Sequence, residues 1–147
     1  MRPTWLIAAF LLSPVVSIAK PATTLGVGEL SCSKEIQEPL CAKLTEGLVA
    51  ALKRRSERPV VRQSEARMKQ RACNQDPECM VKNRATFERV VSGTVRAGES
   101  GVEISLRLLD AKRMEKLAES SARAKSARES ELMAGVESAA AELSLAP

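Results

Sequence analysis

The sequence predicts a single α/β domain built on a mixed five-stranded sheet that is covered by helices. Two patterns carry this prediction: apolar residues recur at helical spacing in the segments 37–55 and 127–143, and they alternate strictly with polar residues over 102–108. The first pattern is typical of amphipathic helices and the second of half-buried strands. The predicted order β-α-β-α-β-β-β-α places a parallel unit before a three-strand meander, which gives a mixed sheet.

The first half of the chain predicts a strand–helix–strand unit. Residues 23–30 are β-prone and lie between Pro21 and Ser31, so we expect a strand there. The helix over 37–55 carries Pro39 in its first turn, where a missing N–H leaves no helical hydrogen bond unmade. The apolar face of this helix comprises Ile36, Leu40, Leu44, Leu48 and Leu52.

Short helices separate the second strand from the meander. The second strand is expected over 59–62, and the hydroxyl of Ser64 is expected to cap a helix over 64–72. Another short helix is predicted over 77–84, with Asp76 as its cap and a proline at its first position.

The meander and the last helix complete the fold. Strands are expected over 87–96, 102–108 and 115–124, and the third of them is the most polar. In the middle strand the alternation places Glu103, Ser105 and Arg107 on the wet face. The final helix, residues 127–143, has an apolar face made of Leu132, Val136, Ala140 and Leu143.

The N-terminus has the features of a cleaved secretory signal peptide. Arg2 gives a positive start, residues 6–12 are apolar, and the small-x-small site 17–19 precedes Lys20. A membrane anchor is the alternative, but it needs about 20 apolar residues, and the charge of Lys20 ends this run first. Cleavage would leave one domain, residues 20–147, with no transmembrane anchor.

No cysteine follows the apolar stretch directly, so the lipid-attachment site of bacterial lipoproteins is absent from the sequence. The expected location is therefore the periplasm or the medium.

Export also determines the expected oxidation state of the four cysteines. In an oxidising compartment two disulfides are expected, and three pairings are open in principle. Short loops flanked by turn formers favour Cys32 with Cys41 and Cys73 with Cys79. Redox catalysis would normally use a Cys-x-x-Cys motif, and a four-cysteine zinc site would use closer spacings than these.

The composition argues against an enzyme and against nucleic-acid binding. The chain has no His, so it lacks His-based triads and His metal ligands, and we expect no catalytic residue, metal or cofactor. Glu99, Glu103 and Asp110 are the acidic candidates, but two fall in turns and one on a wet strand face. After cleavage Phe87 is the single aromatic residue, which excludes base-stacking platforms, and the small net charge also argues against DNA.

A basic cluster between positions 53 and 71 is the candidate binding patch. It would attract an acidic envelope polymer, lipid head groups or an acidic protein. The alternative is a solvated helix end and a polar helix face, since basic residues suit a helix C-terminus. The candidate residues are Arg54, Arg55, Arg58, Arg62, Arg67 and Arg71.

Several local motifs resemble a known family plan. They are the first strand 25–27, the Pro-Val-Val of 59–61, the Val-Val-Ser-Gly-Thr-Val of 90–95 and the following strand and turn 104–110. This succession resembles the small α/β domain shared by the amino-terminal domain of TolB, the curli secretion channel subunit CsgG and the outer-membrane activators of penicillin-binding proteins. Two positions depart from the plan: 110–114 lack the usual Thr-Gly, and the strand entry reads Ala-Thr-Phe.

The resemblance implies a non-enzymatic periplasmic adaptor or accessory factor that binds an envelope protein partner. A second reading is a ring-forming structural subunit, because domains of this plan assemble into rings in secretion-channel and polysaccharide-export relatives. Some bacterial relatives carry a similar cysteine pair at the position of Cys73 and Cys79, which also favours that local disulfide.

Overall fold

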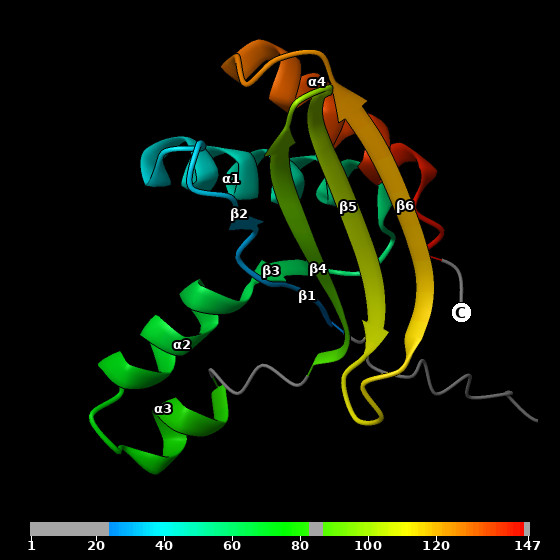
Figure 1. The fold of residues 1–147 in the computed structure, drawn as a ribbon. Helices are drawn as coiled ribbons and strands as arrows, with labels where there is room; N and C mark the ends of the chain where they lie inside the picture. The colour runs from blue at the N-terminus through cyan, green and yellow to red at the C-terminus, as the bar shows by residue number, and fades with distance from the viewer. Residues whose placement is uncertain (1–23, 83–86, 146–147) are drawn as a thin grey trace, which may run out of the picture.

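A computed structural model describes residues 24–82 and 87–145, and it confirms the mixed α/β fold (Figure 1). The sheet has six strands, in the order β3-β1-β4-β5-β6, with β2 also paired to β4. In chain order the elements are β1 (Thr24–Val27), β2 (Ser31–Cys32), α1 (Glu38–Arg55), β3 (Val60–Arg62), α2 (Gln63–Ala72), α3 (Pro77–Lys82), β4 (Phe87–Gly98), β5 (Gly101–Asp110), β6 (Lys116–Ala124) and α4 (Glu129–Glu142).

The sixth strand arises because the first predicted strand is interrupted. The expected strand 23–30 ends at Val27, and pairing resumes only at Ser31 and Cys32, which lie beside the far half of β4. Strands β1, β2 and β3 run parallel to their neighbours, whereas β4, β5 and β6 form the expected antiparallel meander.

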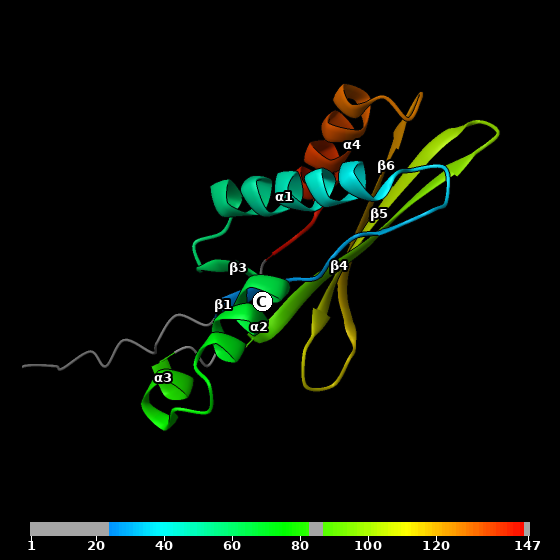
Figure 2. The same cartoon turned by 90° about the vertical axis from the view of Figure 1, so that its left-hand side faces the viewer.

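One face of the sheet packs against α1 and α4 (Figure 2). The core is aliphatic, and the predicted apolar faces of both helices are buried in it, apart from Leu40, which is half-buried. At about 25 cal/mol per Å² of buried apolar surface, this interface is the main source of stability. Its fully buried members include Leu44, Leu48, Leu52, Val91, Val95, Ile104, Leu106, Leu132 and Val136.

Among the described helices, α2 is the one that covers the other face, at its parallel end. A β-carbon on Gly26 would lie 2.9 Å from the ring of Phe87, so the ring lies directly on the backbone of β1. The Phe87 ring also lines a small pocket with Ala66 and Gln70 of α2. This placement agrees with the rule that crossover connections between parallel strands are right-handed. Strands β3 and β4 lie on opposite sides of β1, so the connections through α1 and through α2 run in opposite directions and place these helices on opposite faces of the sheet.

Three boundary predictions were wrong in detail. Helix α2 begins at Gln63, one residue early, and its N-cap is Arg62 with no side-chain cap bond. The hydroxyl of Ser64 interacts with Glu29 instead, because β3 passes into α2 without a turn. The turn between β4 and β5 is also shorter than expected, because only Glu99 and Ser100 separate the strands.

Both predicted disulfides are present, Cys32–Cys41 and Cys73–Cys79. The predicted signal peptide, residues 1–19, and the predicted end of the helix at 83–84 lie outside the described residues. Among the described residues, no helix combines the length and apolar character needed to cross a membrane.

Candidate functional site

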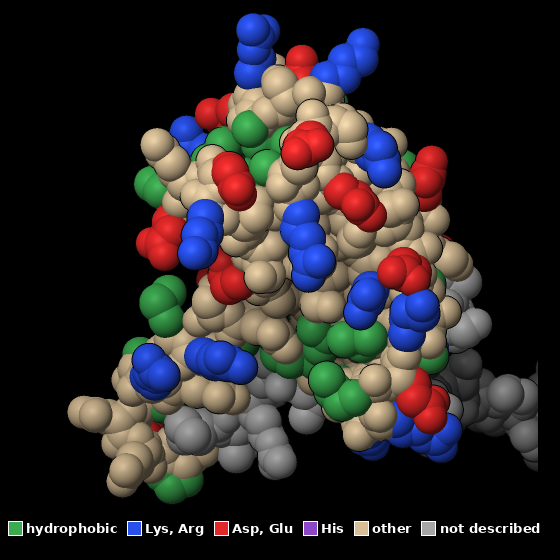
Figure 3. Space-filling view, in the orientation of Figure 1, with side chains coloured by type: hydrophobic (Ala, Val, Ile, Leu, Met, Phe, Trp, Pro, Cys, Tyr) green, Lys and Arg blue, Asp and Glu red, His purple; other side chains and the backbone are tan. Residues whose placement is uncertain are grey.

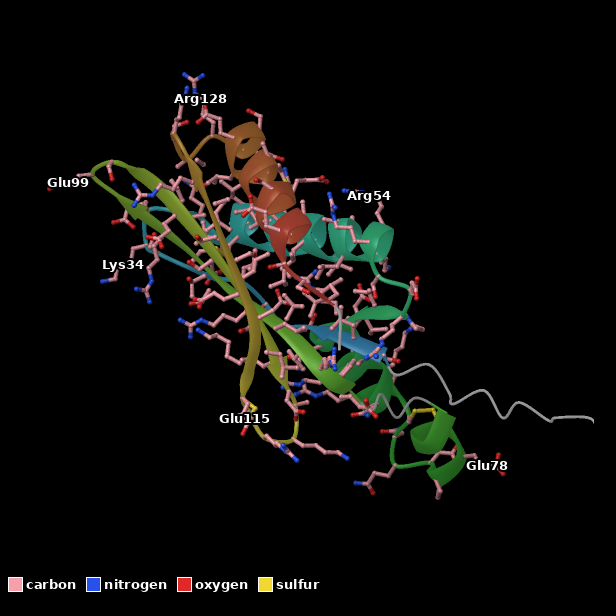
Figure 4. All side chains as sticks on the ribbon, turned by 90° about the vertical axis from the view of Figure 1, so that its right-hand side faces the viewer. Lys34, Arg54, Glu78, Glu99, Glu115 and Arg128 are labelled. Atoms are coloured by element: carbon pink, nitrogen blue, oxygen red, sulfur yellow. A yellow bond between two sulfur atoms is a disulfide. The ribbon has the colours of Figure 1, made fainter. Side chains whose placement is uncertain are left out.

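The structure places two of the six predicted patch arginines in ion pairs. The guanidinium of Arg54, on α1, binds the carboxylate of Glu137 on α4. The guanidinium of Arg62 donates two hydrogen bonds to Glu29, Nε to Oε1 at 2.6 Å and Nη2 to Oε2 at 2.7 Å, and lies 3.8 Å from Glu46. These contacts fasten α1 to α4 and β3 to the loop after β1. Both arginines are therefore already paired with carboxylates of this chain (Arg54 is labelled in Figure 4).

The ion pair between Arg62 and Glu29 shifts the pKa values of both side chains. The hydrogen bond from Arg62 is the largest influence on Glu29 and holds the pKa of that carboxyl below its ordinary value of 4.5. The same bond raises the pKa of Arg62. Each group favours the charged form of the other.

The other four predicted arginines do not form one patch. Arg55 and Arg58 lie at the end of α1 and in the loop after it, whereas Arg67 and Arg71 lie on α2. The end of α1 lies on the covered side of the sheet, and α2 extends away from its β3 end (Figures 1 and 2). The sequence cluster is therefore divided into two basic regions.

The second of these regions is an arm made of α2 and α3. Figure 3 shows basic side chains on it, and the exposed ones on α2 are Arg67, Lys69 and Arg71. Met68 between them is 64% exposed. The Cys73–Cys79 disulfide closes the turn between the helices. The arm therefore presents positive charge on a covalently closed helical hairpin.

A larger feature is the face of β4, β5 and β6 that points away from α1 and α4. No described segment covers it, and Figure 3 views it directly, with acidic, basic and other polar side chains intermingled. A shallow hollow of about 550 Å³ lies over its centre. Its lining comprises Glu29, Ser31, Ser92, Gly93, Thr94, Arg96, Glu103, Ser105, Arg107 and Glu119.

Strand register orders these side chains into three rows across the sheet. The middle row contains only hydroxyl groups; one flanking row alternates charge along all three strands, and the other sets an arginine between a serine and a glutamate. The middle row is Thr94, Ser105 and Ser121. The flanking rows are Arg96, Glu103 and Arg123 on one side, and Ser92, Arg107 and Glu119 on the other. The open face thus has a hydroxyl floor between two charged borders.

Ion pairs fix part of this border. The carboxylate of Glu119 lies 3.4 Å from Nε of Arg107 and accepts a 2.6 Å hydrogen bond from Nζ of Lys116. The Lys116 hydrogen bond is the main reason that the pKa of Glu119 is lowered. The Glu119 carboxylate is therefore charged at neutral pH and offers negative charge beside the arginine.

The acidic residues considered for catalysis are dispersed. Glu99 is exposed in the β4–β5 turn, and Glu103 is exposed on the open face. The carboxylate of Asp110 accepts hydrogen bonds from the backbone N–H groups of Lys112 and Arg113, which lower its pKa and shape the turn before β6. Within residues 24–82 and 87–145, no three His, Cys, Asp or Glu side chains gather as metal ligands would.

Sequence reasoning missed the open face as a site. The wet residues of β5 were identified, but the partners that extend each row lie on β4 and β6 and become neighbours only through register. The available signal was the alternation of small polar and charged residues in all three strands of the meander.

Comparison with known proteins shows similarity in structure alone. No protein-family model matches the sequence, and no curated protein matches it. The structure is similar to a PelC dodecamer subunit from Paraburkholderia phytofirmans, with a TM-score of 0.50, 14% identity, and 82% of this chain and 87% of PelC covered. This similarity supports the α/β fold.

Two further structures are similar at lower TM-scores. The LpoB C-terminal domain from Escherichia coli has a TM-score of 0.49 and 14% identity, over 68% of this chain and 80% of that one. TolB from Acinetobacter baumannii has a TM-score of 0.43 and 16% identity, over 84% of this chain and 29% of TolB.

Proposed function

We propose that this chain is exported and acts in the bacterial envelope as a non-enzymatic adaptor or accessory factor that binds a protein partner. The observation that carries the proposal is the uncovered face of β4, β5 and β6, with its hollow of about 550 Å³. A sheet face left open by the helices of its own domain is available to another molecule. The N-terminal signal-peptide pattern supports export, and the sequence resemblance supports an envelope role.

The lining of the hollow favours a polar partner surface. Charged rows of both signs border a row of hydroxyl groups, so the face offers donors and acceptors with little apolar area. Such charge patterns select a partner and its register more than they add affinity. Aromatic side chains that could stack on a sugar ring are absent from the lining of the hollow. We therefore favour a protein partner over a neutral polysaccharide.

A site-specific cross-linker tests this proposal. A photoreactive residue would replace Ser105, at the hydroxyl floor, or Ser130, which is exposed on α4. In envelope extracts we expect one defined protein to cross-link to the first variant and not to the second. Excess wild-type chain should suppress the cross-link, and excess Arg107→Glu chain should suppress it at least about tenfold less effectively.

Two outcomes would contradict the adaptor proposal. Equal labelling from both positions would show that the open face has no special role, and equal competition by the Arg107→Glu variant would exclude the charged border. Catalytic turnover of an envelope component by the purified chain would overturn the non-enzymatic part.

A second function, a ring-forming structural subunit, has one observation in its favour: the structurally similar PelC forms a dodecamer. Light scattering on the chain recovered from the periplasm separates the two functions. A ring gives a defined high-order oligomer that is independent of concentration over a wide range, whereas an adaptor gives a monomer or a dimer.

A further inference from the structure

Strand β6 is a free edge of the sheet. Among the described residues, no strand pairs with its outer side, and Figure 1 shows it at the margin of the molecule. Its pairing with β5 is regular from Ala118 to Ala124, and this stretch has no proline and no bulge. Natural edge strands are usually short, bulged or blocked, because an exposed regular edge pairs with another strand.

The β4–β5 hairpin determines which backbone groups of β6 are unpaired. A two-residue turn closes on the pair Gly98 and Gly101, which must exchange hydrogen bonds. The direction of the backbone hydrogen bonds alternates along an antiparallel strand, so the N–H and C=O groups of the even-numbered residues of β5 point toward β6. Their partners on β6 are the even-numbered residues 118–124. The N–H and C=O groups of Glu119, Ser121 and Arg123 therefore point outward.

The same three residues carry their side chains on the open face. Ser121 stands midway between a negative and a positive side chain, with Glu119 two residues before it and Arg123 two residues after it. In an antiparallel pair of identical strands centred on Ser121, each Glu119 would stand directly opposite Arg123 of the second copy. Opposite charges in directly facing positions stabilise a sheet, and like charges destabilise it.

From this geometry we propose that two copies of the chain associate through β6, antiparallel and related by a two-fold axis at Ser121, so that the two sheets become one continuous sheet. The contact is isologous, as in most homodimers. This inference is independent of the partner proposed for the open face.

Charge selects this register over the alternatives. A two-fold axis at Glu119 would place two carboxylates opposite each other, and an axis at Arg123 would place two guanidinium groups opposite each other. The axis at Ser121 instead places the Glu119 carboxylate of each copy opposite the Arg123 guanidinium of the other.

The helix side of the edge also leaves room for a second strand. A groove of about 440 Å³ separates β6 from α4, and most of its lining residues are small. In the proposed register Ala122 would face Ser120 of the second copy, and Ala124 would face Ala118, so no bulky side chains meet. The small lining residues are Ser121, Ala122, Ala124, Ala134, Gly135 and Ser138.

The first test measures self-association of protein purified from the periplasm by sedimentation velocity over a concentration series. We expect a monomer–dimer equilibrium for the wild type. The variant Glu119→Arg sets like charges opposite each other at two places and should weaken the dimer at least about tenfold. The double variant Glu119→Arg with Arg123→Glu restores both pairs and should return to within about threefold of the wild type. Arg96→Glu, two strands from the edge, is the charge-reversal control and should leave the dimer unchanged.

A second test blocks the edge through the backbone. In Ser121→Pro the outward N–H is removed and the ring lies where the second strand would pair, while the bonds between β5 and β6 do not use this N–H. We expect a monomer with an unchanged circular dichroism spectrum. In Ser121→Cys, oxidation should link two chains, because facing residues of an H-bonded antiparallel pair have Cα atoms about 5.5 Å apart, within disulfide reach. Ser105→Cys, one strand inward, should not link.

Three results of these tests would each overturn the inference, and a fourth comes from the oligomer size. These are a monomeric wild type up to about 0.5 mM, a double variant as weak as Glu119→Arg, or a Ser121→Pro chain that dimerises like the wild type. A defined high-order ring would also overturn it, and would favour the structural-subunit function instead.

Discussion

The two faces of the β4–β5–β6 meander are made by the same three strands and share almost no property. Toward α1 and α4 the strands present fully buried aliphatic side chains such as Val95, Ile104 and Leu106. One residue along each strand, Thr94 and Ser105 line the open hollow. Side-chain parity therefore separates folding from recognition: one face supplies the core, and the other is free to carry a polar pattern.

The largest expected difference between the faces is in stability. Leu106→Ala removes a side chain that is 0% exposed and should lower the free energy of unfolding by about 2 to 5 kcal/mol, because lost burial and a residual cavity both contribute. Ser105→Ala, its sequence neighbour on the open face, should change it by less than about 0.5 kcal/mol. Urea denaturation followed by circular dichroism measures both. Similar losses would show that the open face also contributes substantially to stability.

The two disulfides differ in the same way, because one belongs to the core and the other to the arm. Cys32–Cys41 joins β2 to α1, and both cysteines pack against the core. Cys73–Cys79 joins α2 to α3 in the arm. Their sequence separations, 9 and 6, are similar, so loop entropy alone would give each about 2 to 3 kcal/mol.

Replacing each pair by serine should nevertheless give different results. Loss of Cys32–Cys41 should destabilise the fold by the full entropic contribution of about 2 to 3 kcal/mol, because that loop belongs to the cooperative core. The melting temperature should fall accordingly. Loss of Cys73–Cys79 should lower it less and should mainly expose the arm to proteolysis, because α2 buries only Ala66 within its length. Calorimetry and limited proteolysis of the two variants separate these effects, and equal losses in melting temperature would show that the arm unfolds together with the core.

Local sequence patterns were sufficient to predict the covered face. Steps of four in α1 and strict alternation in β5 depend on nearest neighbours along the chain, and the residues that the patterns indicated are buried, apart from the half-buried Leu40. Short loops between cysteines also indicated the pairing. The added strand β2 was missed, because its separation from β1 involves a distant residue: the N–H of Leu30 donates to the hydroxyl of Thr45, 15 positions later.

The site could not be predicted in the same way, because it depends on register and on contacts between distant segments. Arg54 looked free in the sequence, but its partner Glu137 is 83 positions away. Arg62 looked like part of a basic run, but the fold brings it to Glu29, 33 positions earlier. The basic cluster is continuous in sequence and divided in space, whereas the rows of the open face are continuous in space and divided in sequence.

Two glycines provide a sharper comparison of the faces. A β-carbon at Gly93 would lie 2.6 Å from Leu106, 2.7 Å from Leu30 and 2.9 Å from the backbone oxygen of Ser105. Gly93→Ala should therefore cost about 1 to 3 kcal/mol through overpacking. At Gly28 the nearest atom would be 3.5 Å away, an ordinary contact, so Gly28→Ala should be neutral or up to about 1 kcal/mol more stable. Urea midpoints test this prediction, provided that the dependence of the unfolding free energy on urea concentration is the same in all chains. Equal destabilisation by the two substitutions would mean that the loop after β1 is as tightly packed as the core.

The smallest effect concerns the rim of the hollow, where the open face contributes to stability through one ion pair. Glu29 and Arg62 are 49% and 17% exposed at their side chains, so the solvent-screened pair should contribute about 1 kcal/mol or less. The pKa of Glu29 is lowered from 4.5 in the folded chain, so the folded state favours the carboxylate. Its contribution is therefore complete above pH 4.5 and is lost as the pH falls through the lower folded-state pKa.

The pH dependence distinguishes this pair from a general loss of charge. Glu29→Gln should be less stable than the wild type at neutral pH, and the difference should shrink toward zero as the pH falls from 4.5 through the folded-state pKa of Glu29. Glu57→Gln, an exposed change in the loop between α1 and β3, provides the control and should show little difference at any pH. Melting temperatures measured over a pH series for the three chains give the result. A Glu29→Gln deficit that persists in acid would mean that the side chain acts through packing, and the open face would then contribute to the fold by shape instead of charge.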